Sequence, residues 1–102
     1  MKIGQVEKQI GISKATIRYY EDKGLIHPSR NNENSYREYS EDDINWLKHI
    51  KVLRALDVPI ADIKELKEKK ITIDEIIDKR LKAIREEENS LEEIKKMYNE
   101  IR

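Results

Sequence analysis

The sequence contains no cysteine, and this absence limits its chemistry. Without cysteine, the chain has no disulfide framework, no thiol nucleophile and no thiolate metal site. It also lacks an apolar run of about 20 residues and a basic leader followed by an apolar stretch. We therefore expect a cytoplasmic protein that has no membrane partner.

The chain also lacks an excess of charge of one sign. Lys plus Arg and Asp plus Glu both number 21, although charged residues make up 41% of the 102 residues. The distribution is less even, because residues 1–37 hold seven basic and four acidic residues, a net charge of +3. The N-terminal part is therefore the mildly basic part of the chain.

Catalytic constellations are missing as well. The sequence shows no glycine-rich phosphate loop and no nucleophile with a matching base. His27 and His49 are the only histidines, and they fall in different predicted elements without cysteine companions. The acidic run 86–88 is typical of a solvated helix face. We expect no enzyme, no cofactor and no metal site.

Apolar periodicity predicts two short helices at the start of the chain. Residues 3–10 repeat apolar side chains at steps of three and four, and Gly11 fits a helix C-cap. Ser13 fits the N-cap of a second helix that ends near residue 23 and turns Ile17 and Tyr20 to one face. Together with Leu25, these two residues are expected in the core.

The next segment predicts a small β wing and two further helices. The pieces LIHP (25–28) and YREY (36–39) alternate with period two and read as strands. Ser40 fits the cap of a helix, and Pro59 fits the first turn of a short one with Ile60, Ile63 and Leu66 inward. The longer helix carries an apolar stripe of Ile44, Leu47, Ile50, Leu53 and Leu56. The fold class is therefore all-α with a small β wing.

Residues 74–102 contain neither glycine nor proline and repeat apolar side chains every seven positions. This heptad pattern is typical of a coiled coil, although Arg80 and Glu87 interrupt its middle. A helix this polar cannot bury its stripe alone, so we expect a second copy as its partner. The alternative is a solvated single helix that frays. The predicted dimer seam is Ile73, Ile77, Ile84, Leu91, Ile94, Tyr98 and Ile101.

Two short helices joined by a tight glycine turn are typical of a helix-turn-helix. In this motif the N-terminal residues of the second helix enter the major groove of DNA, which points to residues 13–18. Lys14 and Arg18 would supply phosphate attraction or a guanine contact. The spacing alone leaves open an ordinary helical pair with a solvated basic edge.

Three segments carry a more specific signal: IGQVEKQIGISKATIRYYEDKGLIHPSR, YREYSEDDINWLKHIKVLR and IADIKEL, in that order. They closely resemble the DNA-binding half of the MerR family of bacterial transcription regulators, from residue 2 to about residue 70. The resemblance implies a winged helix-turn-helix domain over residues 1–70. It also implies a dimerisation helix over residues 71–102, paired as an antiparallel coiled coil.

The resemblance implies a function and partners. Members of this family bind palindromic double-stranded promoter DNA as homodimers, and they kink and untwist it so that polymerase can read both promoter elements. RNA polymerase is thus a further candidate partner. Carried over by position, the DNA contacts fall on Lys14, Thr16, Arg18 and Tyr19 in the second helix, Tyr36 and Arg37 in the wing, and Lys51 and Arg54 in the third helix.

Three departures from the family pattern put local geometry in question. Glu7 replaces a small alanine, so its carboxylate must point outward or find a partner. Ser35 replaces the glycine before the wing's Tyr-Arg, and residues 57–59 replace Gly-Phe-Ser between the third and fourth helices. No ligand-sensing domain or cysteine-bearing metal loop follows the long helix in this sequence.

The sequence therefore predicts a sequence-specific DNA-binding transcription regulator. One alternative is an architectural DNA-binding protein of a phage or mobile element, which uses a similar winged domain to bend DNA. Another is a coiled-coil adaptor that binds proteins and no longer touches DNA. Tyr36 and Arg54 also have plain structural alternatives, as a core cap and as the partner of an acid such as Asp57.

Overall fold

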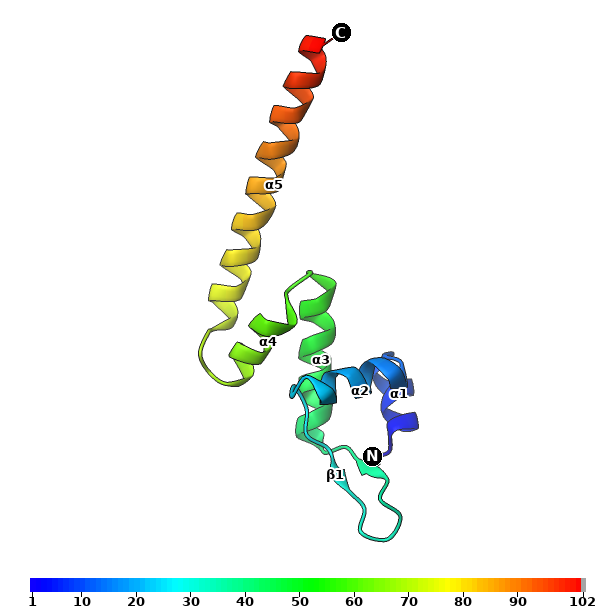
Figure 1. Ribbon diagram of the computed structural model, residues 1–102. Helices are drawn as coiled ribbons and strands as arrows, with labels where there is room; N and C mark the ends of the chain where they lie inside the picture. The colour runs from blue at the N-terminus through cyan, green and yellow to red at the C-terminus, as the bar shows by residue number, and fades with distance from the viewer. Residues whose placement is uncertain (102) are drawn as a thin grey trace. The chain divides into compact units, whose positions relative to one another are not determined.

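The computed structural model describes residues 1–101 and consists of two compact units, Met1–Lys70 and Ile71–Arg102. The first unit is built from helices and one small antiparallel sheet, and the second is a long helix (Figure 1). This confirms the predicted helical fold with a small wing and a long final helix. The elements are α1 (Ile3–Ile10), α2 (Lys14–Asp22), β1 (Ser29–Arg30), β2 (Arg37–Glu38), α3 (Glu41–Ala55), α4 (Ile60–Lys67) and α5 (Ile73–Ile101).

The core of the first unit forms where α1 and α2 pack together and where α3 meets α1 and α4. The predicted core residues Ile17, Tyr20 and Leu25 are all buried, which confirms the helical periodicity. Leu56 was wrongly expected inward and is 49% exposed, because it is the C-cap residue at which the chain leaves α3. The fully buried side chains of this unit are Val6, Ile17, Leu25, Ile26, Leu47, Ile50, Val58 and Ile63.

The wing begins later than the sequence suggests. The first strand was predicted over residues 25–28, but β1 covers Ser29–Arg30 and pairs antiparallel with β2, placing Ser29 opposite Glu38 and Arg30 opposite Arg37. Leu25 and Ile26 lie in the core instead. A period of two over so few residues does not distinguish a strand from a buried extended connection.

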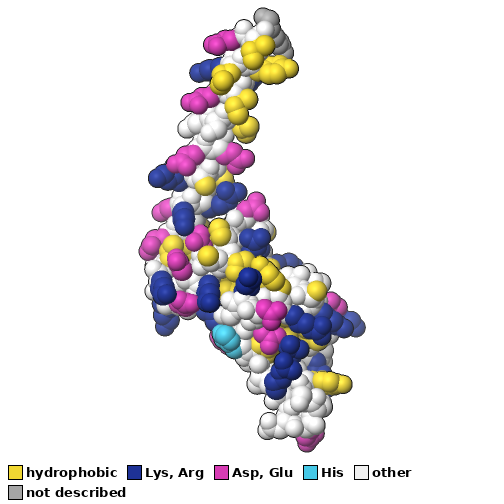
Figure 2. Space-filling view, viewed as in Figure 1, with side chains coloured by type: hydrophobic (Ala, Val, Ile, Leu, Met, Phe, Trp, Pro, Cys, Tyr) yellow, Lys and Arg dark blue, Asp and Glu magenta, His cyan; other side chains and the backbone are white. Residues whose placement is uncertain are grey.

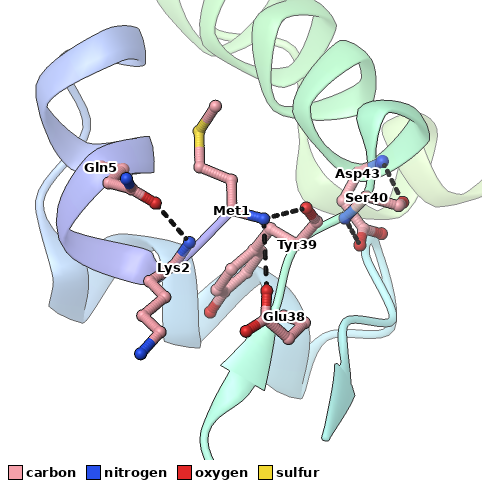
Figure 3. Close-up of polar contacts among 7 residues, drawn as sticks. All are labelled: Met1, Lys2, Gln5, Glu38, Tyr39, Ser40 and Asp43. Carbon is pink, nitrogen blue, oxygen red and sulfur yellow. Dashed lines mark hydrogen bonds and ion pairs between the residues drawn. The ribbon is translucent and has the colours of Figure 1, made fainter. Parts of the chain in front are cut away.

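The N-terminal residue ties the start of α1 to the end of the wing (Figure 3). The amino group of Met1 donates to the carbonyl of Tyr39 at 3.0 Å and to the carboxylate of Glu38 at 3.3 Å. The backbone N–H of Tyr39 in turn donates to the carbonyl of Met1 at 2.8 Å. Residues 1 and 2 therefore lie beside β2, although the two segments are far apart in the sequence.

Helix α3 starts with a reciprocal cap. Ser40 Oγ accepts the backbone N–H of Asp43 at 3.1 Å, and Asp43 Oδ2 accepts the backbone N–H of Ser40 at 3.0 Å (Figure 3). The buried Asp43 also accepts the backbone N–H of His27 at 3.4 Å through Oδ1. One carboxylate thus begins α3 and fixes the segment that leads into the wing.

Helices α2, α3 and α4 end in the same way, with a left-handed residue one position after the cap. These residues are Gly24 (φ 77°), Asp57 (φ 60°) and Lys69 (φ 62°). At each end, two backbone N–H groups fold back onto the carbonyls of the last turn, as in a Schellman motif; after α4, Lys69 bonds Leu66 at 3.1 Å and Lys70 bonds Glu65 at 2.9 Å. Only the end of α2 has the glycine that this conformation favours.

Helix α5 runs without interruption over Ile73–Ile101, as the absence of glycine and proline predicts. Its apolar residues at the predicted seam positions are exposed, from 38% for Ile73 to 80% for Ile101. Leu81 and Met97 are also exposed apolar residues of this helix, and the heptad count missed both. Within residues 1–101, no helix combines the length and apolar composition that crossing a membrane requires.

The left-handed residue after α4 generates a stability prediction. We expect Lys69→Gly to raise the free energy of unfolding by about 0.5–1 kcal/mol, because glycine adopts this conformation without the steric cost that a side chain meets. Urea unfolding followed by circular dichroism measures the change. The matched control is Gly24→Ala at the end of α2, which should lower stability by about 1 kcal/mol. Its added Cβ would lie 3.6 Å from Lys64 Nζ, an ordinary contact, so the cost is conformational. Equal or lower stability of the Lys69 variant would contradict the prediction.

Candidate nucleic-acid interface

The junction between α1 and α2 is held by a lysine from α3. Lys51 Nζ donates to the carbonyl of Ile10 at 2.6 Å, at the C-terminal end of α1. Gly11 follows in the left-handed conformation (φ 77°), and a Cβ there would lie only 3.1 Å from Lys51 Nζ. The backbone conformation therefore favours glycine here, and a Cβ would in addition displace the ammonium group by a few tenths of an ångström.

Glu7 has found a partner at the start of α2. Its carboxylate accepts the backbone N–H of Lys14 at 2.9 Å. This N–H lies in the first turn of α2, where backbone donors lack helical partners and negative charge is favoured. The departure from a small residue at position 7 thus supplies a second cap for α2, beside Ser13, which accepts the N–H of Thr16 at 3.2 Å.

The outer edge of α2 presents the predicted recognition residues. Lys14, Arg18 and Tyr19 are exposed, and Thr16 is half-buried. The hydroxyl of Thr16 accepts a hydrogen bond from Ser13 at 2.9 Å. On the face of Met1–Lys70 drawn in Figure 2, Lys and Arg side chains gather over α1 and α2. Lys14 and Arg18 are four residues apart and lie on the same side of α2, where both are accessible to a ligand, whereas Thr16 lies on another side of the helix.

The wing brings two more predicted residues beside α2. Tyr36 is 61% exposed, so it does not cap the core. Arg37 Nε donates to Glu21 Oε2 of α2 at 2.6 Å, and both side chains are largely buried. This ion pair fastens β2 to the recognition helix. Nearby, Lys2 Nζ lies 5.7 Å from the centre of the Tyr36 ring, in a cation–π contact.

A pocket of about 390 Å³ opens between the start of α1, α2 and the wing. Lys2 and Arg30 line it, and neither is among the site residues predicted from the sequence. No local pattern marks them, because Lys2 precedes α1 and Arg30 lies in a two-residue strand. Their proximity depends on the fold. The pocket is lined by Lys2, Ile3, Arg18, Arg30, Ser35, Tyr36 and Arg37.

Two of the predicted site residues make internal hydrogen bonds. Lys51 caps α1 as described above, and Arg54 Nη1 donates to the carbonyl of Val58 at 2.7 Å in the turn after α3. Both side chains belong to exposed residues of α3. Their use as phosphate contacts stays a prediction, and each now has a structural role that a substitution would also remove.

Burial shifts the pKa values of two titratable side chains near these elements. Burial raises the pKa of the Tyr39 phenol, and the nearby Glu21 carboxylate adds to the rise. The hydroxyl of Tyr39 is buried and has no hydrogen-bond partner among residues 1–101. Burial lowers the pKa of Lys67, whose ammonium donates to the carbonyl of Leu25 and lies over the Trp46 ring. Lys67 thereby links α4 to the segment after α2.

The described residues offer no site for a metal ion. Within residues 1–101, no three His, Asp or Glu side chains gather closely enough to hold one. The charged groups that do gather are cations with hydrogen-bond donors, around α2 and the wing. Such donors suit phosphate oxygens, so the arrangement can bind a nucleic-acid backbone.

Comparison with known proteins gives a consistent result. The model of the MerR HTH family regulatory proteins matches residues 1–70. The HTH-type transcriptional regulator AdhR of Bacillus subtilis (strain 168) is 43% identical over 65 residues, which cover 64% of this chain and 46% of the relative. The HTH-type transcriptional regulator ZntR homolog of Haemophilus influenzae is 35% identical over 91 residues, 82% of this chain and 67% of the relative.

A solved structure is similar along almost the whole chain. HiNmlR, described as a MerR family regulator lacking the sensor domain and bound to promoter DNA, superposes with a TM-score of 0.64 at 28% identity. The match covers 99% of this chain and 74% of that chain. Against curated relatives such as AdhR, the chain spans about half of their length.

The hydrogen bond from Lys51 to the end of α1 predicts an effect on stability that is independent of any phosphate contact by this lysine. We expect Lys51→Met to lower the free energy of unfolding by about 1 kcal/mol, because the carbonyl of Ile10 loses a charge-assisted hydrogen bond. Chemical denaturation measures this loss without DNA. Lys48→Met, one turn earlier on the same helix, removes the same charge and serves as the control. If both variants are as stable as the wild type, the cap does not contribute to stability.

Proposed function

The chain belongs to the MerR family of helix-turn-helix regulatory proteins, and we propose that it is a sequence-specific transcription regulator that binds promoter DNA as a homodimer. The observation that carries this proposal is that Arg18 of α2 lines one pocket with Tyr36 and Arg37 of the wing, while Lys14 and Tyr19 of the same helix are exposed. The likeness to HiNmlR bound to promoter DNA supports it.

Each part of this surface has a distinct task on DNA. The N-terminal edge of α2 fits the major groove, where Lys14 and Arg18 reach base edges or phosphates. The wing fits the adjacent backbone, with the Tyr36 hydroxyl and the remaining donors of Arg37 directed at phosphate oxygens. The Glu21–Arg37 ion pair keeps both parts in a fixed relation, so base reading and backbone contact are set together.

The exposed stripe of α5 supplies the second half of the proposal. In an antiparallel pair with its two-fold axis between residues 87 and 88, Ile84 faces Leu91 of the partner subunit. The same register places Ile77 opposite Tyr98 of the partner subunit and Leu81 opposite Ile94 of the partner subunit. Every one of these side chains is exposed in the single chain, from 40% for Ile77 to 65% for Tyr98. Pairing therefore covers apolar surface that water otherwise contacts.

The remaining parts of the proposal follow from the family. We propose that binding distorts the promoter, and that RNA polymerase is a further partner that can then read both promoter elements. A role as an enzyme is not proposed, since the relatives are transcription regulators. A regulator of bacterial promoters acts where the chromosome is, which makes the cytoplasm its proposed location.

DNA binding is tested by selecting bound sequences from a random pool and titrating the selected DNA at two salt concentrations. We expect a palindromic site, and we expect Arg18→Ala and Arg37→Ala each to weaken binding about 10- to 100-fold and to flatten its salt dependence. Lys82→Ala on α5 removes the same charge outside the proposed surface and is the control. If no DNA binds at low salt, the chain is an adaptor and the proposal fails.

The antiparallel seam is tested by engineered cysteines, which the natural sequence lacks. We expect neither Ile84→Cys nor Leu91→Cys to cross-link alone under mild oxidation, and a mixture of the two variants to form a disulfide dimer. Non-reducing electrophoresis separates the products. Cross-linking of Ile84→Cys with itself would indicate parallel helices. Sedimentation tests the dimer itself. If the wild type is only a monomer at tens of micromolar, a concentration suited to modest interfaces, the proposed seam is wrong.

A further inference from the structure

The pocket between α1, α2 and the wing concentrates positive charge. Lys2 and Arg30 enter it together with Arg18 and Arg37, and the other lining residues are uncharged. Only Arg37 is offset by a close carboxylate, that of Glu21 at 2.6 Å, among the ion pairs found in residues 1–101. At about 390 Å³, the pocket lies near the lower end of the range of about 300–1,000 Å³ for small-molecule sites.

The register of the wing adds an independent observation. Arg30 lies directly opposite Arg37 in the antiparallel pair. Like charges at directly opposite positions destabilise a sheet, and this sheet has only two residues in each strand to resist the repulsion. Glu21 offsets Arg37 from one side, while Arg30 faces the pocket. An anion in the pocket would relieve the remaining repulsion.

The two cations are held in place by contacts that leave donors available. Arg30 uses Nη1 to donate to the carbonyl of Ser35 at 3.2 Å, and a guanidinium has five N–H donors in total. The backbone N–H of Lys2 donates to Gln5 Oε1 at 3.0 Å, and its ammonium lies over the Tyr36 ring. The contact of the Lys2 ammonium with the Tyr36 ring and the hydrogen bond of Arg30 with Ser35 favour positions beside the pocket, which lowers the cost of ordering these side chains around a ligand.

We infer that this pocket is a phosphate-ester site with Lys2 and Arg30 as ligands beside Arg18, and that it holds one phosphodiester of the DNA backbone. The inference rests on the proposed function and deepens it, because it assigns a contact to the start of α1 and to β1. The volume accommodates a phosphate with part of its sugar. Donors from α1, α2 and the wing converge on it, so one phosphate would fix all three elements on the duplex.

The experiment measures the affinity of Lys2→Gln and Arg30→Gln for the selected DNA over a series of salt concentrations. We expect each variant to bind about 10-fold more weakly at low salt, and the slope of log K against log salt to become less steep by at most about 0.9, the contribution of the one phosphate in the pocket. Lys82→Gln, with the same loss of charge on α5, should match the wild type. Arg30→Lys should recover part of the affinity, which distinguishes charge from a damaged wing.

The outcomes separate the site from the function. If the wild type binds DNA and both glutamine variants keep its affinity and slope, the phosphate site is overturned and the proposed function stands. If the wild type binds no DNA, the proposed function fails, and a DNA phosphodiester is excluded as the ligand of the pocket. Titration with inorganic phosphate, followed by NMR of the arginine side chains, tests for a free phosphate ester. If Arg30→Gln abolishes the resonance shifts seen in the wild type but leaves the DNA affinity and salt slope unchanged, the pocket binds a small phosphate ester instead of the DNA backbone.

Discussion

The position of the recognition helix depends on how the chain turns between α1 and α2. Three polar groups act on this turn from different directions: Lys51 on the last carbonyl of α1, Glu7 on the first N–H of α2, and Ser13 at its cap. Gly11 adopts the left-handed backbone conformation beside the ammonium group of Lys51. Because the predicted DNA contacts Lys14 and Arg18 lie on α2, the angle at this turn determines where they point.

The wing also depends on α2 for its position. Two residue pairs are too few to hold a hairpin in place, so the wing relies on Glu21 of α2 and on the N-terminal residues beside β2. The ion pair between Glu21 and Arg37 therefore joins the two elements that are proposed to contact DNA. A substitution at Glu21 would therefore act on both, although this residue contacts no ligand in the proposed arrangement.

Much of the fold could be predicted from local signals in the sequence. The cap at Ser13, the glycine at position 11 and the apolar steps of α1 and α2 act within a few residues, so they gave the correct helices. Ile26 was misplaced because a short apolar run fits either a strand or a buried connection. Leu81 was missed because a strict count of sevens passes over neighbouring positions that share the same helix face.

The candidate site was less accessible to prediction, for a physical reason. Lys51 reaches a carbonyl 41 positions away, and Lys2 meets Arg30 only after the N-terminus has docked beside β2. Long basic side chains look alike in a sequence whether they cap a helix or face a ligand. Only the positions that matched a family signature could be assigned in advance.

The brevity of the wing has a kinetic consequence. Its ladder joins Ser29 to Glu38 and Arg30 to Arg37, closed by a hydrogen bond from Asn31 to Tyr36 at 2.8 Å. Amide hydrogens in so short a ladder exchange with solvent through local opening, while those in the helices of the same unit exchange only when the core opens. The protection of the wing's amides is therefore set by what lies against the hairpin, and it reports on the occupancy of that surface.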